Sequence, residues 1–400
     1  MSPSAAEAII ASLDRINLES LDNDRDARLQ VLEAARRMLA RIETPFERAW
    51  QLSWTNGSVH AVCQVILDLG LWQAWLESGK QEVSLEELLV MCKVPCDMML
   101  LRRLFRLLNA VYIVEETGQD RYRPTPFSLA LGKPDSPVTQ TIIAGTHHGI
   151  DSCRNLPRFL ARTSYEEPLD PTDTNYMDLT PERQAMFARC QANTAYQASF
   201  IGFMEGLNDY KLDWTEVYDT RELLDGFDVD GSAALFVDVG GAHGLDVTRL
   251  LDRYPDLPPG KLILQDTPDV VEMVKVSDKI TAMAYDFFTP QPVKGARAYF
   301  MHSILHDWDD RDARRILGRV AAAMATGFSK LLLYETFVPS TGATLYHSAV
   351  DIALMHLVSA SERSEIRWRW LLQSAGFEVV RVWSHPSSLE SVIEAELLAE

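Results

Sequence analysis

Beyond Phe227 the sequence alternates two kinds of segment, and this alternation restricts the fold more than any other feature of the chain. Short runs rich in Val, Ile and Leu are separated by segments of helical periodicity, as in parallel sheets built from strand-helix-strand units. We predict strands at ALFVDVG, KLILQD, KITAMAYD, ARAYFMH and SKLLLYET, and after a helix at FEVVRVW and LESVIEAELL. Because the last two can form a hairpin, the pattern predicts a doubly wound α/β sheet of seven strands with an antiparallel strand near one edge.

Residues 1 to about 225 instead show helix after helix. In AVCQVILDLGLWQAWLESG the apolar residues recur three and four apart and predict one apolar helical stripe, formed by Val62, Val65, Ile66, Leu69 and Trp72. We therefore divide the chain into a helical domain over residues 1–135, a helical linker and pocket region over 136–225, and the sheet domain over 226–400.

The helical domain has the outline of two helices followed by a hairpin wing. Ser84 and Glu87 form a capping box before LEELLVM, DMMLLRRLFRLLNA gives the next helix, and YIVEE with RYRPT gives the hairpin. This outline also occurs in DNA-binding domains, and Arg102, Arg103 and Arg106 fit that use. The net charge of -19 opposes it, because binding to a phosphate backbone needs a cationic face. We expect no nucleic-acid partner.

The rest of the composition indicates a globular intracellular protein. No stretch has the basic start and apolar core of a signal peptide, and none is long and apolar enough to span a bilayer. The five cysteines are odd in number and form no C-x-x-C pair, which favours free thiols in a reducing compartment. We expect a cytosolic (cytoplasmic) protein with no membrane partner.

FVDVGGAHGLDVTRLL predicts a strand, a glycine turn and a helix. Asp238 precedes the turn, Gly240 and Gly241 allow a sharp turn and a close approach to a ligand, and Gly244 opens the helix. Many such turns merely connect a strand to a helix, so the turn alone is a weak signal of nucleotide binding.

The next two predicted strands strengthen that signal. Asp266 ends the second strand, where doubly wound folds place the carboxylate that binds a ribose, and Asp286 with Phe287 follows the third. The turn lacks the spaced glycines of the dinucleotide fingerprint, and its acid precedes the turn. This pattern suits a cofactor without a pyrophosphate and with a cationic end, and S-adenosyl-L-methionine fits it.

At this point the chain resembles a known family. DLGLWQAW, LLRRLFRLLNA, FVDVGGAHG, LQDTPDVV, HDWDD and SASERSE before LLQSAGF match, in order and spacing, the small-molecule O-methyltransferases of plants and fungi. The resemblance implies a class I methyltransferase (Rossmann-like) domain behind a winged-helix-like dimerisation domain, and therefore a homodimer. It also implies methylation of a phenol-like hydroxyl of a secondary metabolite, with S-adenosyl-L-homocysteine as the second product.

The resemblance places the general base on His306 in HDWDD, flanked by Glu335 and Glu362. An imidazole of ordinary pKa is mostly unprotonated at neutral pH and can accept a hydroxyl proton, and a neighbouring carboxylate fixes its tautomer. Each residue also has an ordinary structural interpretation: His306 at a helix start, Glu335 as a surface acid, and Glu362 in an ion pair with Arg363.

The other residues of this motif have simpler expectations. Asp307, Asp309 and Asp310 fall in a predicted first helical turn, where negative charge offsets the helix dipole, so we interpret them as structural. Trp308 is expected to pack against the core or to form a wall near the adenine. A metal site would need His302 and His306 on one helix, but His302 falls at a strand end, so we expect no metal.

The chain departs from the family pattern at two positions. Ala242 stands where relatives have a third glycine, and His302, expected to face the cofactor, stands where many have lysine or arginine. Some similar fungal proteins bind the cofactor without transferring its methyl group and act as pericyclases or dehydratases, using a histidine of the helical domain. His147 and His148 are candidates for that chemistry, or surface histidines.

The expected substrate is flat and largely apolar. Its predicted pocket is lined by Phe200, Phe203 and Met204 from the helical region, with His147 and His148 nearby and Met355 opposite. These apolar residues are equally compatible with a buried core.

Overall fold

The computed structural model describes residues 4–13, 15–16, 21, 24–385 and 387–398. The chain divides into two compact units, residues 1–62 and 63–400, and each is described by itself. The division at residues 135 and 225 stays a prediction.

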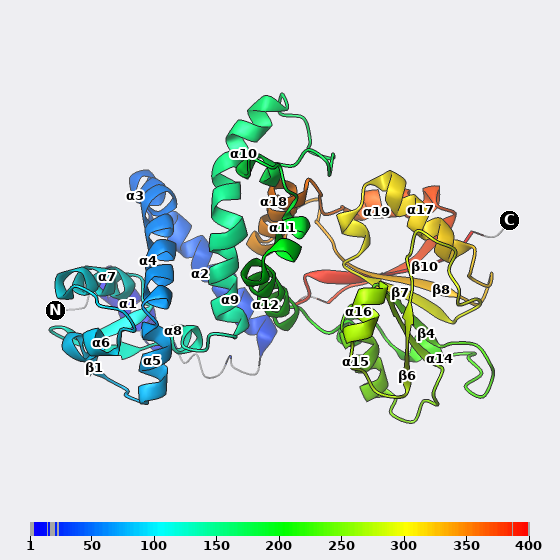
Figure 1. Ribbon diagram of the computed structural model, residues 1–400, viewed down its shortest axis with the longest axis horizontal. Helices are drawn as coiled ribbons and strands as arrows, with labels where there is room; N and C mark the ends of the chain where they lie inside the picture. Colours follow the sequence, from blue (N-terminus) through cyan, green and yellow to red (C-terminus); the bar gives the residue numbers. More distant parts are fainter. Residues whose placement is uncertain (1–3, 14, 17–20, 22–23, 386, 399–400) are drawn as a thin grey trace. The chain divides into compact units, whose positions relative to one another are not determined.

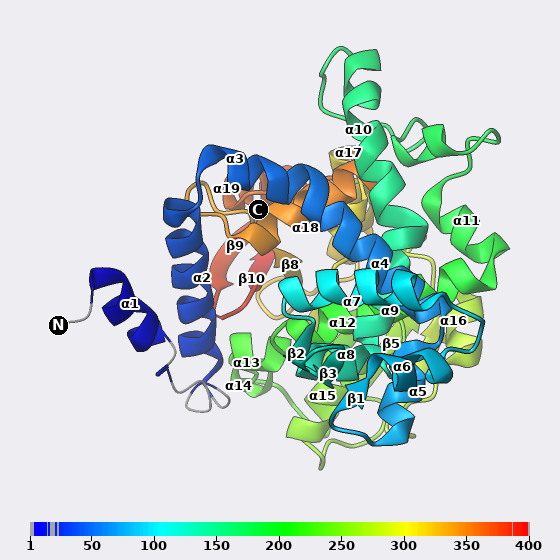
Figure 2. The same cartoon turned by 90° about the vertical axis from the view of Figure 1, so that its left-hand side faces the viewer.

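The first unit is helical. It holds α1 (Ala5–Leu13), α2 (Arg25–Ile42), α3 (Pro45–Trp50), η2 (Gln51–Thr55) and the start of α4 (Asn56–Asp68). Thr44 and Glu47 form a capping box that starts α3 at a sharp angle to α2 (Figure 2). Phe46, Trp50 and Trp54 then form an aromatic row, with ring centroids 6.1 and 5.8 Å apart, and their exposed fractions are 73%, 52% and 65%. This unit therefore carries an exposed apolar strip.

The second unit begins with the predicted winged outline. It contains α5 (Leu71–Ser78), β1 (Val83–Ser84), α6 (Leu85–Met91), α7 (Met98–Ala110), β2 (Val114–Gly118) and β3 (Arg121–Pro124), with strand order β1-β3-β2. The capping box of Ser84 and Glu87 is present. Arg102 forms an ion pair with Asp120 at 2.8 Å, so this guanidinium supports the wing.

One helix prediction was wrong. The stripe from Val62 to Trp72 does not lie on one helix, because the chain breaks at Gly70, whose φ of 64° is left-handed. Ile66, Leu69 and Trp72 are still buried, whereas Val65 is 38% exposed. Apolar spacing alone therefore did not reveal the break.

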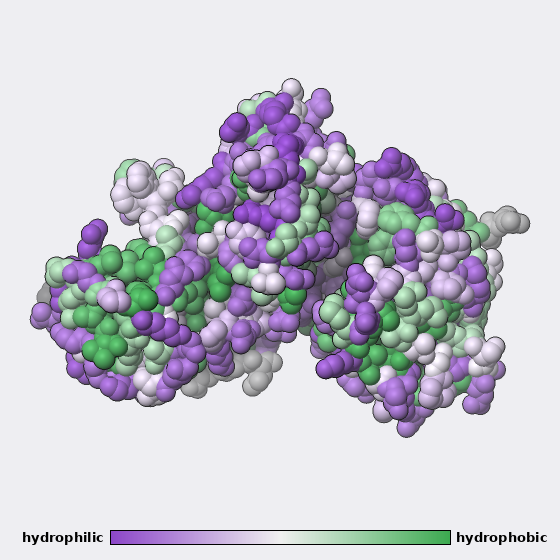
Figure 3. Space-filling view, in the orientation of Figure 1, coloured by the Kyte–Doolittle hydropathy of each residue, from purple (hydrophilic) through white to green (hydrophobic). Residues whose placement is uncertain are grey.

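Further helices lead to the sheet. They are α8 (Pro126–Leu131), α9 (Pro137–Ala144), η3 (Gly145–Gly149), α10 (Ile150–Arg162), η4 (Tyr176–Leu179), α11 (Met186–Ala192), α12 (Thr194–Tyr210), α13 (Trp214–Val217) and α14 (Arg221–Leu224). The outer surface of α10 is mostly hydrophilic, while Ser152 and Phe159 are buried on its inner side (Figure 3). Helix α10 thus follows the ordinary amphipathic pattern.

All seven predicted strands of the large sheet are confirmed (Figure 1). They are β4 (Phe236–Val239), β5 (Leu262–Asp266), β6 (Ile280–Ala284), β7 (Ala298–His302), β8 (Lys330–Thr336), β9 (Phe377–Trp383) and β10 (Glu390–Leu397). Their order is β6-β5-β4-β7-β8-β10-β9, and β10 runs antiparallel to both of its neighbours. The carboxyl ends of β4, β5, β7 and β8 therefore share one edge, where a doubly wound sheet binds its ligand.

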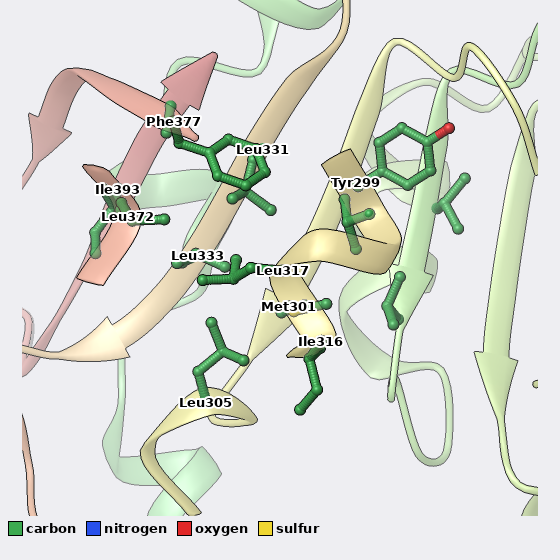
Figure 4. Close-up of a cluster of buried hydrophobic side chains, with 14 of the residues drawn as sticks. Tyr299, Met301, Leu305, Ile316, Leu317, Leu331, Leu333, Leu372, Phe377 and Ile393 are labelled. Atoms are coloured by element: carbon green, nitrogen blue, oxygen red, sulfur yellow. The ribbon is translucent and has the colours of Figure 1, made fainter. Parts of the chain in front are cut away.

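Helices cover both faces of this sheet. On one face, α17 (Asp310–Ala321) and α19 (Glu365–Ser374) bury the side chains around Leu317, Leu333 and Leu372 (Figure 4). On the other, α13 and α15 (Leu245–Arg253) pack around Trp214, Leu250 and Phe300, while α16 (Pro268–Met273) contacts β5 and β6. Two apolar layers therefore hold the strand ends in fixed positions.

No single described helix has both the length and the apolar composition to cross a bilayer. One pair, Pro45–Asp68 with Leu71–Ser78, meets those criteria jointly but is bent by 64°. All five cysteines carry free thiols. The cytosolic location stays a prediction.

Candidate active site

The glycine turn after β4 has the geometry that its sequence predicts. Gly240 and Gly244 have φ values of 77° and 76°, and a Cβ on Gly241 would come within 2.4 Å of the Asp238 side chain. Ala242 has a φ of 46°, a left-handed conformation that costs roughly 1–2 kcal/mol in a residue with a side chain. Its N–H donates to Asp266 Oδ2 at 2.9 Å, so the carboxylate at the end of β5 holds this turn.

Asp238 is a buried acid beside this turn. Asp238 is only 1% exposed, and neither of its carboxyl oxygens has a hydrogen-bond partner among the described residues. Burial raises the pKa of Asp238 well above its usual value, and the charge of Asp246 raises it further. Because an unpartnered buried carboxyl calls for a donor or a cation, the residues present fit the ammonium end of S-adenosyl-L-methionine.

The third predicted acid lies in an aromatic corner. Asp286 follows β6 by two residues and accepts a hydrogen bond from Phe288 N–H at 2.9 Å. Phe287 and Phe288 meet Trp308 edge to face, with ring centroids 5.8 and 4.9 Å apart. A corner of this kind can bind the flat face of an adenine.

His306, Glu335 and Glu362 come together although they are distant in sequence. The 3-10 turn η5 (Leu305–Asp307) presents His306, whose Nδ1 lies 3.2 Å from Glu362 Oε1. Glu335 Oε1 accepts the N–H groups of Ile304 and Leu305 at 3.2 and 2.9 Å and so fixes this turn. Among the described residues no hydrogen-bond partner occupies His306 Nε2, since the nearest carboxylate, Asp307, is 3.7 Å away.

Two alternatives weighed from the sequence were wrong. Arg363 does not pair with Glu362; it lies 3.0 Å from Asp310 and donates to the carbonyl oxygens of Leu305 and Trp308. Asp307 does not lie in the first turn of α17, which begins at Asp310 with Asp309 as its N-cap. Asp307 instead sits in η5 beside His306.

The electrostatics of the site also differ from the prediction. Burial lowers the pKa of His306, but the charges of Asp307 and Glu362 outweigh it and raise the pKa to about 10. The expectation of a mostly unprotonated imidazole at neutral pH was therefore wrong for the protein without ligand. Burial also raises the pKa of Glu335 to about 7.

His302, expected to face the cofactor, lies between two carboxylates. Its Nδ1 lies 2.6 Å from Asp246 Oδ2, and its Nε2 lies 3.2 Å from Glu390 Oε2. Lys211 Nζ donates to the other oxygen of Glu390 at 2.6 Å. The sequence did not indicate Asp246, Glu390 or Lys211, although strand alternation places Glu390 on the same face as Val392. Nor is there a group of three or more His, Cys, Asp or Glu side chains arranged to hold a metal in the described ranges.

Neither of the two histidines of the helical region is exposed: His148 is buried and His147 is half-buried. His148 is only 4% exposed, and its Nδ1 lies 2.9 Å from the Tyr176 hydroxyl. His147 Nδ1 lies 2.8 Å from Ser199 Oγ, and its ring lies 4.4 Å from that of Tyr196. Burial lowers the pKa of both, which favours neutral imidazoles.

A cavity of about 240 Å³ lies beside His306 and includes Leu169, Pro171 and Trp308 in its lining. A second cavity, of about 560 Å³, is also lined by Leu169, Pro171 and Trp308. Sequence patterns did not single out the loop that carries Leu169 and Pro171.

The predicted substrate residues are half-buried on α12 and α18 (Leu345–Val358): Phe200, Phe203, Met204 and Met355.

Known proteins match the chain in sequence and in structure. The family model of the O-methyltransferase domain matches residues 188–378. O-methyltransferase ATR12 of Stachybotrys chlorohalonatus is 40% identical over 395 residues, which cover 98% of this chain and 99% of the relative. O-methyltransferase mfmE of Annulohypoxylon moriforme is 35% identical, covering 98% and 96%.

A solved structure extends this similarity to the whole fold. LepI in complex with S-adenosyl-L-methionine has 27% sequence identity and a TM-score of 0.87, covering 99% of this chain and 100% of that protein. The solved structure of a pericyclic reaction enzyme has 27% identity and a TM-score of 0.86, covering 98% of this chain and 99% of that protein. The cofactor is S-adenosyl-L-methionine, with S-adenosyl-L-homocysteine as product. The chain belongs to the O-methyltransferase family of S-adenosyl-L-methionine-dependent enzymes that act on small secondary metabolites.

Proposed function

We propose that this protein methylates a phenol-like hydroxyl of a small secondary metabolite, with His306 as general base. The observation that supports this most directly is the arrangement of His306: Glu362 holds Nδ1, and Nε2 has no hydrogen-bond partner among the described residues. When bound, S-adenosyl-L-methionine supplies an electrophilic methyl group on a sulfonium. The protein then has to bring the hydroxyl oxygen and that carbon together and to accept one proton.

The proton affinities of base and substrate are well matched. A phenol has a pKa of about 10, and the surrounding carboxylates raise the pKa of His306 to about 10. Once His306 has lost its own proton, transfer of the hydroxyl proton to Nε2 is nearly balanced in free energy, and Glu362 stabilises the imidazolium that forms. At neutral pH only a small fraction of the ligand-free protein has an unprotonated His306, so turnover should rise with pH. Glu335 acts through the backbone by holding Ile304 and Leu305, and with them His306.

The carboxyl edge of the sheet would hold the cofactor. Asp266 is assigned to the ribose hydroxyls, and Asp238 to the ammonium group beside Gly240, Gly241 and Gly244. Phe287 and Trp308, whose rings form a corner, would enclose the adenine together with Asp286. The half-buried Phe200, Phe203, Met204 and Met355 would line an apolar substrate pocket, near His147.

We also propose a homodimer. The strip of Phe46, Trp50 and Trp54 exposes three large aromatic side chains on one short segment, and such strips usually bind another apolar surface. A second copy of the chain suits it, since homodimers are the commonest oligomers.

One observation supports a second function. The similarity to the pericyclic reaction enzyme covers 98% of this chain, so its fold supports pericyclic as well as methyl-transfer chemistry. In that alternative the cofactor stays intact and a substrate isomerises or loses water. The pair of His306 and Glu362 favours methyl transfer, because that reaction needs a base.

The deciding experiment is to incubate the protein with methyl-labelled S-adenosyl-L-methionine and a panel of phenols and hydroxypyridones. Mass spectrometry should find labelled product and demethylated cofactor in equal amounts. Substrate that isomerises or loses water while the cofactor stays intact would instead support the pericyclase or dehydratase.

A further inference from the structure

A row of charged side chains crosses one face of the sheet at its carboxyl edge. Asp238 of β4 pairs in register with Phe300 of β7, so His302, two residues further on, is its diagonal neighbour on the same face. Glu390, at the start of the antiparallel β10, contacts His302 from the other side. Asp246 of α15 and Lys211, the C-cap of α12, complete the row.

The contacts of His302 require a doubly protonated ring. Both ring nitrogens lie within 3.2 Å of carboxylate oxygens, and carboxylates accept but do not donate. A neutral imidazole has a single N–H and would turn a lone pair toward one of them. Although burial lowers the pKa of His302, Asp246 and Glu390 raise it to about 10, in agreement with this geometry. His302 is therefore a fixed internal cation.

Three charged groups determine the charge of Asp238. Asp246 of α15 and Asp266 of β5 favour its neutral form, as does burial, whereas His302 of β7 favours its carboxylate. The backbone of Val247 also favours the carboxylate, although neither Asp238 oxygen has a hydrogen-bond partner of good geometry among the described residues. Removing the charge of His302 would leave Asp246 with Arg249 as its cationic partner, 3.4 Å away on α15, and would remove the cation that favours the Asp238 carboxylate.

We infer that His302, locked between Asp246 and Glu390, is a positioning residue for the cofactor: its fixed positive charge favours the ionised form of Asp238, which receives the ammonium group. This inference rests on the proposed role of Asp238. It implies that His302 acts through Asp238 and not by touching the cofactor, since both of its nitrogens are already paired.

The test is calorimetric titration with S-adenosyl-L-homocysteine at a series of pH values, because burial raises the pKa of Asp238 well above its usual value and the charge of this carboxyl therefore depends on pH. The His302→Gln variant should bind on the order of tenfold more weakly than the wild type at the acid end. The difference in affinity between His302→Gln and the wild type should narrow as the pH rises, because Asp238 then ionises even without the positive charge of His302. His302→Lys, which keeps a cation, should bind like the wild type.

Two outcomes would overturn the inference. One is unchanged affinity of His302→Gln at every pH; the other is a loss of the same factor at every pH, which a merely structural role predicts. Glu390→Gln gives a second test if His302→Gln fails to fold. That variant leaves His302 paired with Asp246 and removes a negative charge, so its affinity at the acid end should equal or exceed that of the wild type. A weaker affinity there contradicts the inference.

Asp238→Asn separates this inference from the proposed function. Its binding should be weak and independent of pH. If Asp238→Asn binds as tightly as the wild type, the assignment of Asp238 itself is wrong, and the inference falls with it. If Asp238→Asn binds weakly but His302→Gln does not, only the role of His302 is refuted.

Discussion

Glu335 offers a direct test of the electrostatics at the candidate site, through stability rather than activity. The residue is fully buried, and its Oε2 has no hydrogen-bond partner among the described residues. Burial raises its pKa from 4.5 to about 7. Glutamine has the same shape as the protonated acid and never ionises. The substitution Glu335→Gln therefore removes a charge that the folded protein resists.

The sign and size of the effect follow from the pKa. A carboxyl whose pKa is raised by folding stabilises the fold below its unfolded pKa, and this contribution is lost as the pH rises through the folded pKa. A shift from 4.5 to about 7 corresponds to about 3 kcal/mol. Relative to the wild type, Glu335→Gln should therefore gain about 3 kcal/mol in free energy of unfolding between about pH 4.5 and pH 8.

Urea denaturation of the ligand-free protein, followed by tryptophan fluorescence at both pH values, measures this difference. Glu272→Gln on α16 is the matched control, because Glu272 is exposed and should show little pH-dependent difference. A difference between Glu335→Gln and the wild type that stays constant with pH would refute the raised pKa, and with it the described burial of the charge.

Four further results are expected. His306→Ala should lower turnover by roughly 10²–10⁴-fold with binding of S-adenosyl-L-homocysteine retained, and unchanged turnover would exclude its role as base. Asp266→Ala should weaken that binding in calorimetry, since it removes the acceptor of the Ala242 N–H as well as the proposed ribose contact; unaltered affinity counts against the assignment. Ala242→Gly should raise the free energy of unfolding by about 0.5–1 kcal/mol, because relief of a left-handed alanine exceeds the added flexibility of glycine; a lower value contradicts the described turn. Trp50→Ala should shift the protein from dimer to monomer in light scattering, and an unchanged mass would locate the dimer contact elsewhere.

The strands of the sheet were predictable because the signal is local. The inner strands β4, β5, β7 and β8 are short runs of buried, mostly apolar side chains, whereas the edge strands β6 and β9 are largely exposed. In both kinds of strand the residue pattern is read from a few neighbouring residues and does not depend on distant partners. The glycine turn was predictable for the same reason: Gly240 and Gly244 occupy left-handed positions that few other residues tolerate. The break at Gly70 was missed because the apolar spacing continues across it, and only the left-handed backbone interrupts the helix.

The charges of the site could not be predicted in this way, because they depend on residues far away in sequence. The ring of His302 is set by Asp246 and Glu390, which lie 56 and 88 residues away. The pKa of His306 depends on burial, on the adjacent Asp307 and on Glu362, and Glu362 comes from the segment between α18 and α19. A motif identifies which residues meet at a site, but their protonation depends on the folded surroundings.

The stretch MHSILH shows how the sheet gives two nearby histidines different chemistry. His302 ends β7 on the face of Phe300, where α15 and β10 bring a carboxylate to each ring nitrogen. The chain then turns through Ser303, whose φ is 50°, into η5, which faces the Glu335 and Glu362 side of the sheet. There His306 has one nitrogen held and one without a hydrogen-bond partner among the described residues. The surrounding carboxylates raise the pKa of both rings to about 10. The two differ in that only His306 can release its Nε2 proton without turning a lone pair toward a hydrogen-bonded carboxylate, which makes it the candidate base.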